Sequence, residues 1–401
     1  MSASQTPGHR SATLASPGAA EQAHSERLTA LIRSEIRAHG SIPFWRFMEL
    51  ALYAPGLGYY SAGKTKFGAS GDFITAPELG ELFARTVARA TANVLSADSA
   101  THFLEVGGGT GSFAATALAE WERLGTLPRR YRILERSAEL RERQQATLSA
   151  RVPQLLHRVD WLDTPPETRW RGVLFANEVI DALPVHRFVV RAGELRECQV
   201  ALDAADQLCF QERDADGMLI AAVAHLAADL DGPLAEGYQS EVLPQLPYWI
   251  DAVCGTLEAG IAVFIDYGYP RREYYLPERN RGTLSCHRQH RMHTDPLRWP
   301  GLQDITAWVD FTALAEAATG IGLPLAGFTT QTQFLIAAGL LDLWQVEQLA
   351  VDEAGRLRLT EELKRLTLPA EMGESFKVMC FARGIDQLPP AFTAYDQSHR
   401  L

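Results

Sequence analysis

The middle of the chain alternates short, nearly continuous apolar runs with longer segments whose apolar residues recur at helical spacing. Strands of a parallel sheet are covered on both faces, so they are apolar throughout rather than at every second position. The pattern therefore predicts an α/β fold with a mostly parallel, Rossmann-like sheet. Its strands are expected at residues 103–106, 131–135, 155–159, 170–176 and 262–266, with a last, antiparallel strand at 376–382.

The segments around these strands have other patterns. Helices are expected at 26–38 and 41–53, and another begins at Thr75, which has the spacing of a capping box with Glu78. Residues 187–210 alternate and turn like antiparallel hairpins, which predicts an inserted accessory sheet. The expected divisions are a flexible tail (1–25), an N-terminal helical segment (26–100), a Rossmann-like core (101–186), the inserted sheet (187–245), the rest of the core with a substrate-facing loop and helices (246–384), and a tail (385–401). One of the helices in the fifth division is expected at 333–346.

A glycine-rich loop follows the first strand. Gly107, Gly109 and Gly111 belong to a run with four glycines in five positions, and Glu105 precedes it. Such a turn cradles either a dinucleotide or S-adenosylmethionine, and Glu135 at the end of the second strand suits the ribose hydroxyls of both. Glu105 favours S-adenosylmethionine, because a carboxylate suits the cationic methionine end and is of no use beside a pyrophosphate.

Polar residues after the third and fourth strands extend this candidate site. Asn177, Glu178 and Asp181 follow the fourth strand, and the carboxyl ends of parallel strands converge on one crevice. Carboxylates gathered there suit a cation, although Asn177 and a nearby acid also suit the N-terminus of a helix. Asp160 and Trp161, after the third strand, either hold an adenine or belong to the edge of the core.

The composition excludes several classes of function. The chain has 401 residues and a formal net charge of -11, which argues against sequence-independent binding to nucleic acid. Its five cysteines are scattered, so neither a disulfide framework nor a cysteine zinc site is expected. Because no apolar run is long enough for a membrane span and no targeting segment is recognised, we expect the protein in the cytoplasm.

Residues 271–298 hold seven arginines and three histidines with few apolar groups, which indicates a long loop. Such a loop is either solvated or contacts an acidic segment of a partner. His287, His290 and His293 are spaced by three, but no acidic residue stands in ligand register with them. No metal site is expected here.

Six motifs together resemble the MidA-type family of class I methyltransferases, in unbroken order from about residue 28 to 384: Gly71–Glu78, Glu105–Gly111, Asn177–Pro184, Asp266–Gly268, Gln303–Phe311 and Met372–Lys377. The resemblance implies S-adenosylmethionine as cofactor and a protein arginine as acceptor, since the family includes the mitochondrial assembly factor that methylates a core subunit of respiratory complex I. It implies a catalytic set of Asn177, Glu178 and Asp181, and a cofactor pocket that includes Gly71, Asp72, Phe73 and Thr75. The alternative for the stretch from Gly71 to Phe73 is a plain turn before the helix.

Other functions stay open at this point. A nicotinamide-dependent oxidoreductase would use the same glycine loop for a dinucleotide, and a non-catalytic assembly chaperone would keep the S-adenosylmethionine pocket without turnover. A nucleic-acid methyltransferase is disfavoured, because the segment after the fourth strand lacks the N-P-P-aromatic form that stacks a flipped base. The expected partner is a protein substrate, and a homodimer also stays open.

Overall fold

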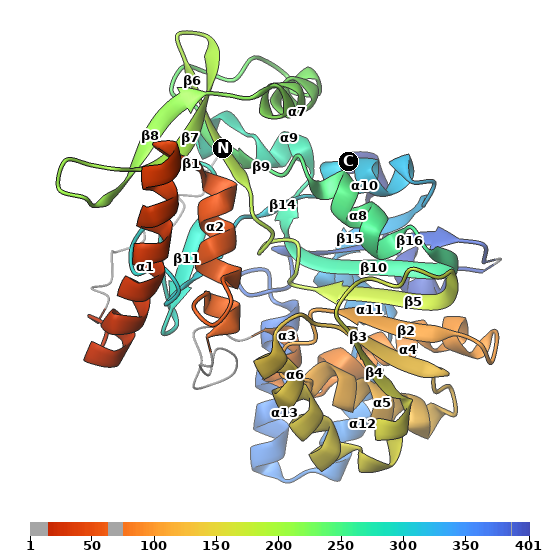
Figure 1. Ribbon diagram of the computed structural model, residues 1–401. Coiled ribbons are helices and arrows are strands. Elements are labelled where there is room, and N and C mark those ends of the chain that lie inside the picture. The colour runs from red at the N-terminus through yellow and green to blue at the C-terminus, as the bar shows by residue number, and fades with distance from the viewer. Residues whose placement is uncertain (1–14, 63–74, 386) are drawn as a thin grey trace.

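A computed structural model describes residues 15–62, 75–385 and 387–401 (Figure 1). The core strands are β2 His102–Val106, β3 Arg130–Leu134, β4 Val159–Leu162, β5 Trp170–Asn177, β10 Leu257–Tyr269, β14 Val309–Asp310, β15 Leu325–Thr330 and β16 Phe376–Arg383. They pair in the order β15-β16-β10-β5-β2-β3-β4, with β14 beside β10. Among the described pairs of this sheet, those of β16 with β10 and β15 are antiparallel and the others are parallel. The predicted α/β fold with an antiparallel last strand is confirmed.

Helices cover both faces of this sheet: α4 Leu82–Ser96, α5 Ser112–Leu124, α6 Ala138–Arg151, α8 Leu246–Cys254, α10 Phe311–Gly320, α11 Gln331–Ala337, α12 Leu340–Ala350 and α13 Glu353–Thr367. Phe103 and Val173 face the cluster formed with α4, α5, α6, α11, α12 and α13. Their neighbours Leu104 and Leu174 belong to a second cluster, which includes residues of α8 and α10. These two helices lie on the opposite side of the sheet (Figure 1). Burial on both faces explains why these strands are apolar along their whole length.

An antiparallel layer is inserted between β5 and β10, as predicted, and contains β6 His186–Arg191, β7 Glu194–Leu202, β8 Leu208–Asp214, β9 Gln239–Val242 and the helix α7 Gly217–Ala228. Another small sheet joins β11 Ser285–Arg288, β12 Arg291–His293 and β13 Asp304–Thr306. The N-terminal elements α1 Ala19–His39, β1 Ile42–Pro43 and α2 Phe44–Tyr53 lie beside both sheets (Figure 1). Phe44 and Phe47 share one buried cluster with Val200, Cys286 and Ile305, so the two small sheets and the N-terminal helices form one unit.

Several predicted boundaries are wrong. The first helix begins at Ala19, seven residues before its predicted start at 26. The strand expected at 155–159 is a 3₁₀ helix, η2 Pro153–Arg158, in which Leu155 is buried, and β4 starts only at its end. The helix expected at 333–346 is divided at Gly339, whose φ of 87° lies outside the right-handed helical region.

The helix expected from Thr75 is also divided, into α3 Ala76–Leu79 and α4. A Cβ at Gly80, between them, would overlap the carboxylate of Glu362 on α13. That carboxylate accepts the N–H of Leu82 at 2.7 Å and so caps α4. Thr75 precedes α3 but makes no side-chain cap hydrogen bond, so the predicted capping box is wrong.

The arginine-rich stretch 271–298 is not one long loop, because it contains α9 Arg271–Tyr274, η3 Pro277–Arg279, β11 and β12. Arg271 and Arg288 are each only 2% exposed. Arg271 forms an ion pair with Asp310 at 3.3 Å, and Arg288 with Glu21 of α1 at 2.9 Å. These two arginines join elements within the protein and are not available to a partner.

The last residues pack on the core instead of forming a tail. Two 3₁₀ turns, η4 Pro390–Phe392 and η5 Ser398–Arg400, lie in this segment. Phe392 is buried and stacks on Phe334 of α11 with ring centroids 5.1 Å apart. In the described ranges, no helix combines the length and the apolar character needed to cross a bilayer.

Candidate active site

A cavity of 1370 Å³ opens where β2, β3 and β5 end. Residues of α2, of the 3₁₀ turn η1 Tyr59–Ser61, and of β11 and β13 complete its lining. A pocket for one small molecule usually encloses about 300–1,000 Å³. The cavity therefore has room for a cofactor together with part of a second ligand.

Most of the predicted site residues that the structure describes line this cavity: Thr75, Glu105, Gly107, Gly109, Glu135, Asn177, Glu178 and Asp181. Gly111, Asp160 and Trp161 lie outside its lining. Gly71, Asp72 and Phe73 lie outside the described residues. The structure thus brings together acids from three strand ends, while the role of each residue stays a prediction.

The glycine loop connects β2 to α5 through a left-handed backbone. Gly107, Gly109 and Gly111 have φ angles of 72°, 50° and 84°, which residues with side chains rarely adopt. A Cβ at Gly109 would meet no atom of the other described residues within 4 Å, so these residues leave space for a ligand there. Thr110 donates a hydrogen bond to the Glu78 carboxylate, which fastens the loop to α3.

Glu135 is held beside this loop by Gln144 of α6, which the sequence analysis missed. The fully buried Gln144 donates from Nε2 to the carbonyl of Gly109 (3.1 Å) and to Glu135 Oε2 (3.3 Å). Its Oε1 accepts the indole N–H of Trp161 at 2.9 Å. Burial raises the pKa of Glu135. The backbone N–H of Ser137, which donates to this carboxylate at 2.9 Å, opposes that rise. Trp161 itself lies outside the cavity lining and is joined to Gln144 by its indole hydrogen bond.

Two other described acids that were predicted to contact the cofactor have contrasting surroundings. Glu105 is 4% exposed and accepts a hydrogen bond from the hydroxyl of Tyr131 at 2.7 Å. Burial raises the pKa of Glu105 to about 7, so this carboxyl changes charge near neutral pH. Asp160 is 41% exposed and lies 3.7 Å from Arg130, in a surface ion pair away from the cavity.

The segment after β5 is a turn without a helix, so the helix-cap alternative is wrong. Oδ2 of Asp266 on β10 accepts the backbone N–H groups of Val179, Ile180 and Asp181 at 3.2, 3.0 and 3.2 Å. Glu178, just before them, has a φ of 53°, which is uncommon for a residue with a side chain. A buried carboxylate thus holds this turn in an unusual conformation, and such conformations gather at functional sites.

Glu178 and Asp181 are carboxyl groups with raised pKa values. Desolvation, and then the charge of Asp181, raise the pKa of Glu178 to about 8, although Asn177 Nδ2 donates to Glu178 Oε1 at 3.0 Å. Desolvation likewise raises the pKa of Asp181 to about 6. Oδ1 of Asn177 and Oδ1 of Asp181 are buried and have no hydrogen-bond partner among the described residues. Because unpaired buried acceptors are costly, they indicate a ligand rich in donors.

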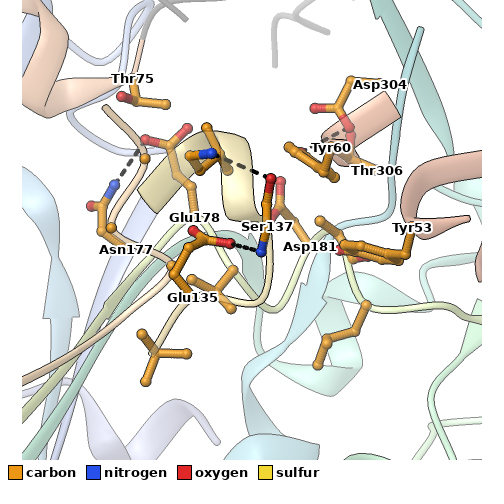
Figure 2. A pocket seen from close by; sticks show the side chains of 18 of the residues that line it. Tyr53, Tyr60, Thr75, Glu135, Ser137, Asn177, Glu178, Asp181, Asp304 and Thr306 are labelled. Carbon is orange, nitrogen blue, oxygen red and sulfur yellow. Dashed lines mark hydrogen bonds between the residues drawn. The ribbon is translucent and has the colours of Figure 1, made fainter. Parts of the chain in front are cut away.

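Residues that received no predicted role form the other side of the cavity, where Figure 2 shows Tyr53, Tyr60, Asp304 and Thr306 facing the side of Asn177 and Glu178. Asp304 and Thr306 belong to one of the motifs that carry the family resemblance, which was the available signal. Tyr53 and Tyr60 had none. The hydroxyl of Tyr60 donates to Asp304 Oδ1 at 2.9 Å. The two residues are 244 positions apart in the sequence, so no local pattern predicts their contact.

The lining is strongly acidic. Among the described residues, carboxyl groups on the cavity far outnumber guanidinium groups, of which Arg46 and Arg136 are present. Arg46 already forms an ion pair with Glu35 at 2.7 Å. The acids are Glu49, Glu78, Glu105, Glu135, Glu139, Glu178, Asp181 and Asp304. A cavity lined by one sign of charge concentrates ligands of the opposite sign, which are cations here.

Comparisons with known proteins agree with this geometry. Residues 82–329 match the model of a family described as "Putative S-adenosyl-L-methionine-dependent methyltransferase". A crystal structure of a COG1565 superfamily member from Burkholderia thailandensis, bound to S-adenosyl-homocysteine, is 44% identical, with a TM-score of 0.90 over 97% of this chain and 100% of that chain. Protein arginine methyltransferase NDUFAF7 of Danio rerio is 27% identical over 86% of this chain and 84% of the relative. Its homologue in Drosophila melanogaster is 27% identical over 91% and 87%. These matches decide between the two cofactors that the glycine loop allowed, in favour of S-adenosylmethionine.

Proposed function

Because the chain belongs to this family of S-adenosylmethionine-dependent methyltransferases, we propose that it methylates an arginine side chain of a protein. The observation that carries the proposal is the acidic cavity, in which Glu178 and Asp181 lie near the glycine loop. Asp181 Oδ1 has no hydrogen-bond partner in the described part of the chain. A guanidinium presents five N–H donors in one plane and pairs with carboxylates in bidentate fashion. The names of the curated relatives, which are protein arginine methyltransferases, support the same acceptor.

The residues of the cavity fit S-adenosylmethionine. The glycine loop leaves open space at Gly109, and Glu135 stands at the end of β3, where an acid accepts hydrogen bonds from ribose hydroxyls. Glu105 and the neighbouring carboxylates suit the positive charges of the methionine end. When bound, the cofactor supplies a methyl group on a positively charged sulfur, which is open to in-line displacement.

Glu178 and Asp181 act on the acceptor. As carboxylates they hold the guanidinium and draw its charge away from the attacking nitrogen. Methyl transfer forms an N–C bond, breaks the S–C bond and releases one proton from the guanidinium, which a carboxylate within reach accepts. Asn177 orients Glu178 through its hydrogen bond of 3.0 Å. The pKa of Glu178, about 8, suits a group that gains and loses a proton near neutral pH.

The target to test first is a core subunit of respiratory complex I, because the family that the motifs resemble includes an assembly factor that methylates one. We place the reaction in the cytoplasm, as the sequence predicts. The experiment is incubation of cell extract with labelled S-adenosylmethionine, followed by mass spectrometry of the labelled polypeptide. Wild-type protein should label an arginine, and Glu178→Gln should not.

The control for this experiment is Glu142→Gln, which changes an exposed acid on α6 and should label like wild type. Label on lysine or on nucleic acid would overturn the arginine assignment. Normal labelling by Glu178→Gln would remove Glu178 from the catalytic role. If wild-type protein binds the cofactor and labels nothing, the non-catalytic assembly chaperone becomes the better description.

A further inference from the structure

Two tyrosines from the N-terminal segment form a stacked pair on the wall of the cavity (Figure 2). Tyr53 ends α2 and Tyr60 lies in η1, with ring centroids 5.5 Å apart and an interplanar angle of 20°. The hydroxyl of Tyr60 donates to Asp304 Oδ1 at 2.9 Å, and that of Tyr53 donates to the carbonyl of Ala182 at 2.9 Å. Each ring is therefore fixed at its polar end by a different part of the chain.

The surroundings of Tyr53 are those of a cation site. Tyr53 lines the cavity and is 38% exposed, so part of this residue is accessible to a ligand. Asp304 and Asp181 are only 3% and 5% exposed. They lie close enough that their charges, after the larger effect of desolvation, raise the pKa of Tyr53. Asp181 Oδ1 lacks a hydrogen-bond partner among the described residues, so a donor from a ligand has a place beside this ring.

We propose that Tyr53, supported by Tyr60, is the aromatic platform on which the guanidinium of the acceptor arginine stacks, while Asp181 and Asp304 accept its N–H groups. The inference rests on the proposed arginine methylation and names the residues that select arginine. A planar guanidinium stacks on an aromatic face while it donates hydrogen bonds in its own plane, and it is less strongly hydrated than an ammonium. The site therefore favours arginine over lysine.

Steady-state kinetics test the platform with two peptides, one carrying the arginine identified by labelling and the other carrying lysine in its place. Tyr53→Leu should raise KM for the arginine peptide about five- to thirtyfold, which corresponds to the loss of a cation–π contact of about 1–2 kcal/mol. Affinity for S-adenosylhomocysteine should stay unchanged. Tyr53→Phe keeps the ring face and should raise KM less than Tyr53→Leu. The control is Tyr248→Leu, which changes a tyrosine of α8 that is 74% exposed and outside the cavity lining.

Each outcome bears on one of the two claims. Unchanged KM for the arginine peptide in Tyr53→Leu overturns the platform and leaves arginine methylation intact. Equal kcat/KM of wild type for the arginine and lysine peptides overturns the selection. If Tyr53→Leu also loses affinity for S-adenosylhomocysteine, the result for Tyr53→Phe decides. A KM for the arginine peptide that rises as much in Tyr53→Phe as in Tyr53→Leu overturns the platform, and a smaller rise supports it. Labelling of cell extract that identifies no methylated arginine refutes the proposed function itself.

Discussion

Replacing Glu178 by glutamine removes the carboxyl group whose ionisation the proposed chemistry requires. Desolvation and the charge of Asp181 raise the pKa of Glu178 to about 8. Glu178 is then charged in about a tenth of the free enzyme at pH 7 and in about nine tenths at pH 9. Asp181, with a pKa of about 6, is already mostly charged at pH 7. If the carboxylate of Glu178 is the active form, kcat/KM should rise about tenfold from pH 7 to pH 9.

The assay is the pH dependence of kcat and kcat/KM for wild type, Glu178→Gln and the Glu142→Gln control. The Glu178 variant should lose about 10²–10⁴-fold in kcat, the usual contribution of general acid–base catalysis, and should lose the rise with pH. Bound cations favour the carboxylate of Glu178 and should lower its pKa, by one unit for about each 1.36 kcal/mol of interaction. In wild type, kcat reports the complex and should therefore level off at a lower pH than kcat/KM, which reports the free enzyme. A flat wild-type profile, or the same rise in the glutamine variant, would refute the reasoning.

Two further substitutions test the cofactor side of the cavity. Gly109→Val places a side chain in the open space of the loop and should abolish S-adenosylhomocysteine binding in calorimetric titration. The control is Gly193→Val, because Gly193, on the hairpin between β6 and β7, also has a positive φ and open space around it. This control should lower the melting temperature similarly without affecting binding. Normal binding by the Gly109 variant would contradict the predicted cofactor pocket. Gln144→Leu removes the donor to Gly109 and Glu135, so KM for S-adenosylmethionine should rise about tenfold or more while KM for the acceptor stays unchanged. A change confined to the acceptor KM would contradict that positioning role.

The parallel strands were predictable because burial on both faces leaves an apolar run in the sequence. Strands β5 and β10 lie inside the sheet and are buried along most of their length. Strand β4 forms the edge and is only partly buried, so the apolar signal at 155–159 came instead from a 3₁₀ helix that buries Leu155. A local pattern of apolar residues reports burial more directly than it reports conformation.

The strand-end acids were predictable for a topological reason, since parallel strands end at a shared edge and Glu135, Glu178 and Asp181 follow such ends. Tyr53 reaches the same cavity from a helix, and Asp304 from a separate small sheet. Their convergence depends on how the N-terminal unit packs on the core, which no short-range pattern encodes. Gln144 lies in a largely polar helix, where its burial left no trace in the sequence.

Strand β16, described above as the antiparallel member of the sheet, lies between β10 and β15 although it is the last of the described core strands along the chain. During synthesis from the N-terminus, these other strands leave the ribosome first. Until residues 376–383 arrive, β10 keeps an unpaired edge, which is a template for pairing with other chains. The core sheet is therefore completed only after all of its other described strands have been synthesised. A chain that stops before β16 lacks the strand that joins β15 to the rest of the sheet.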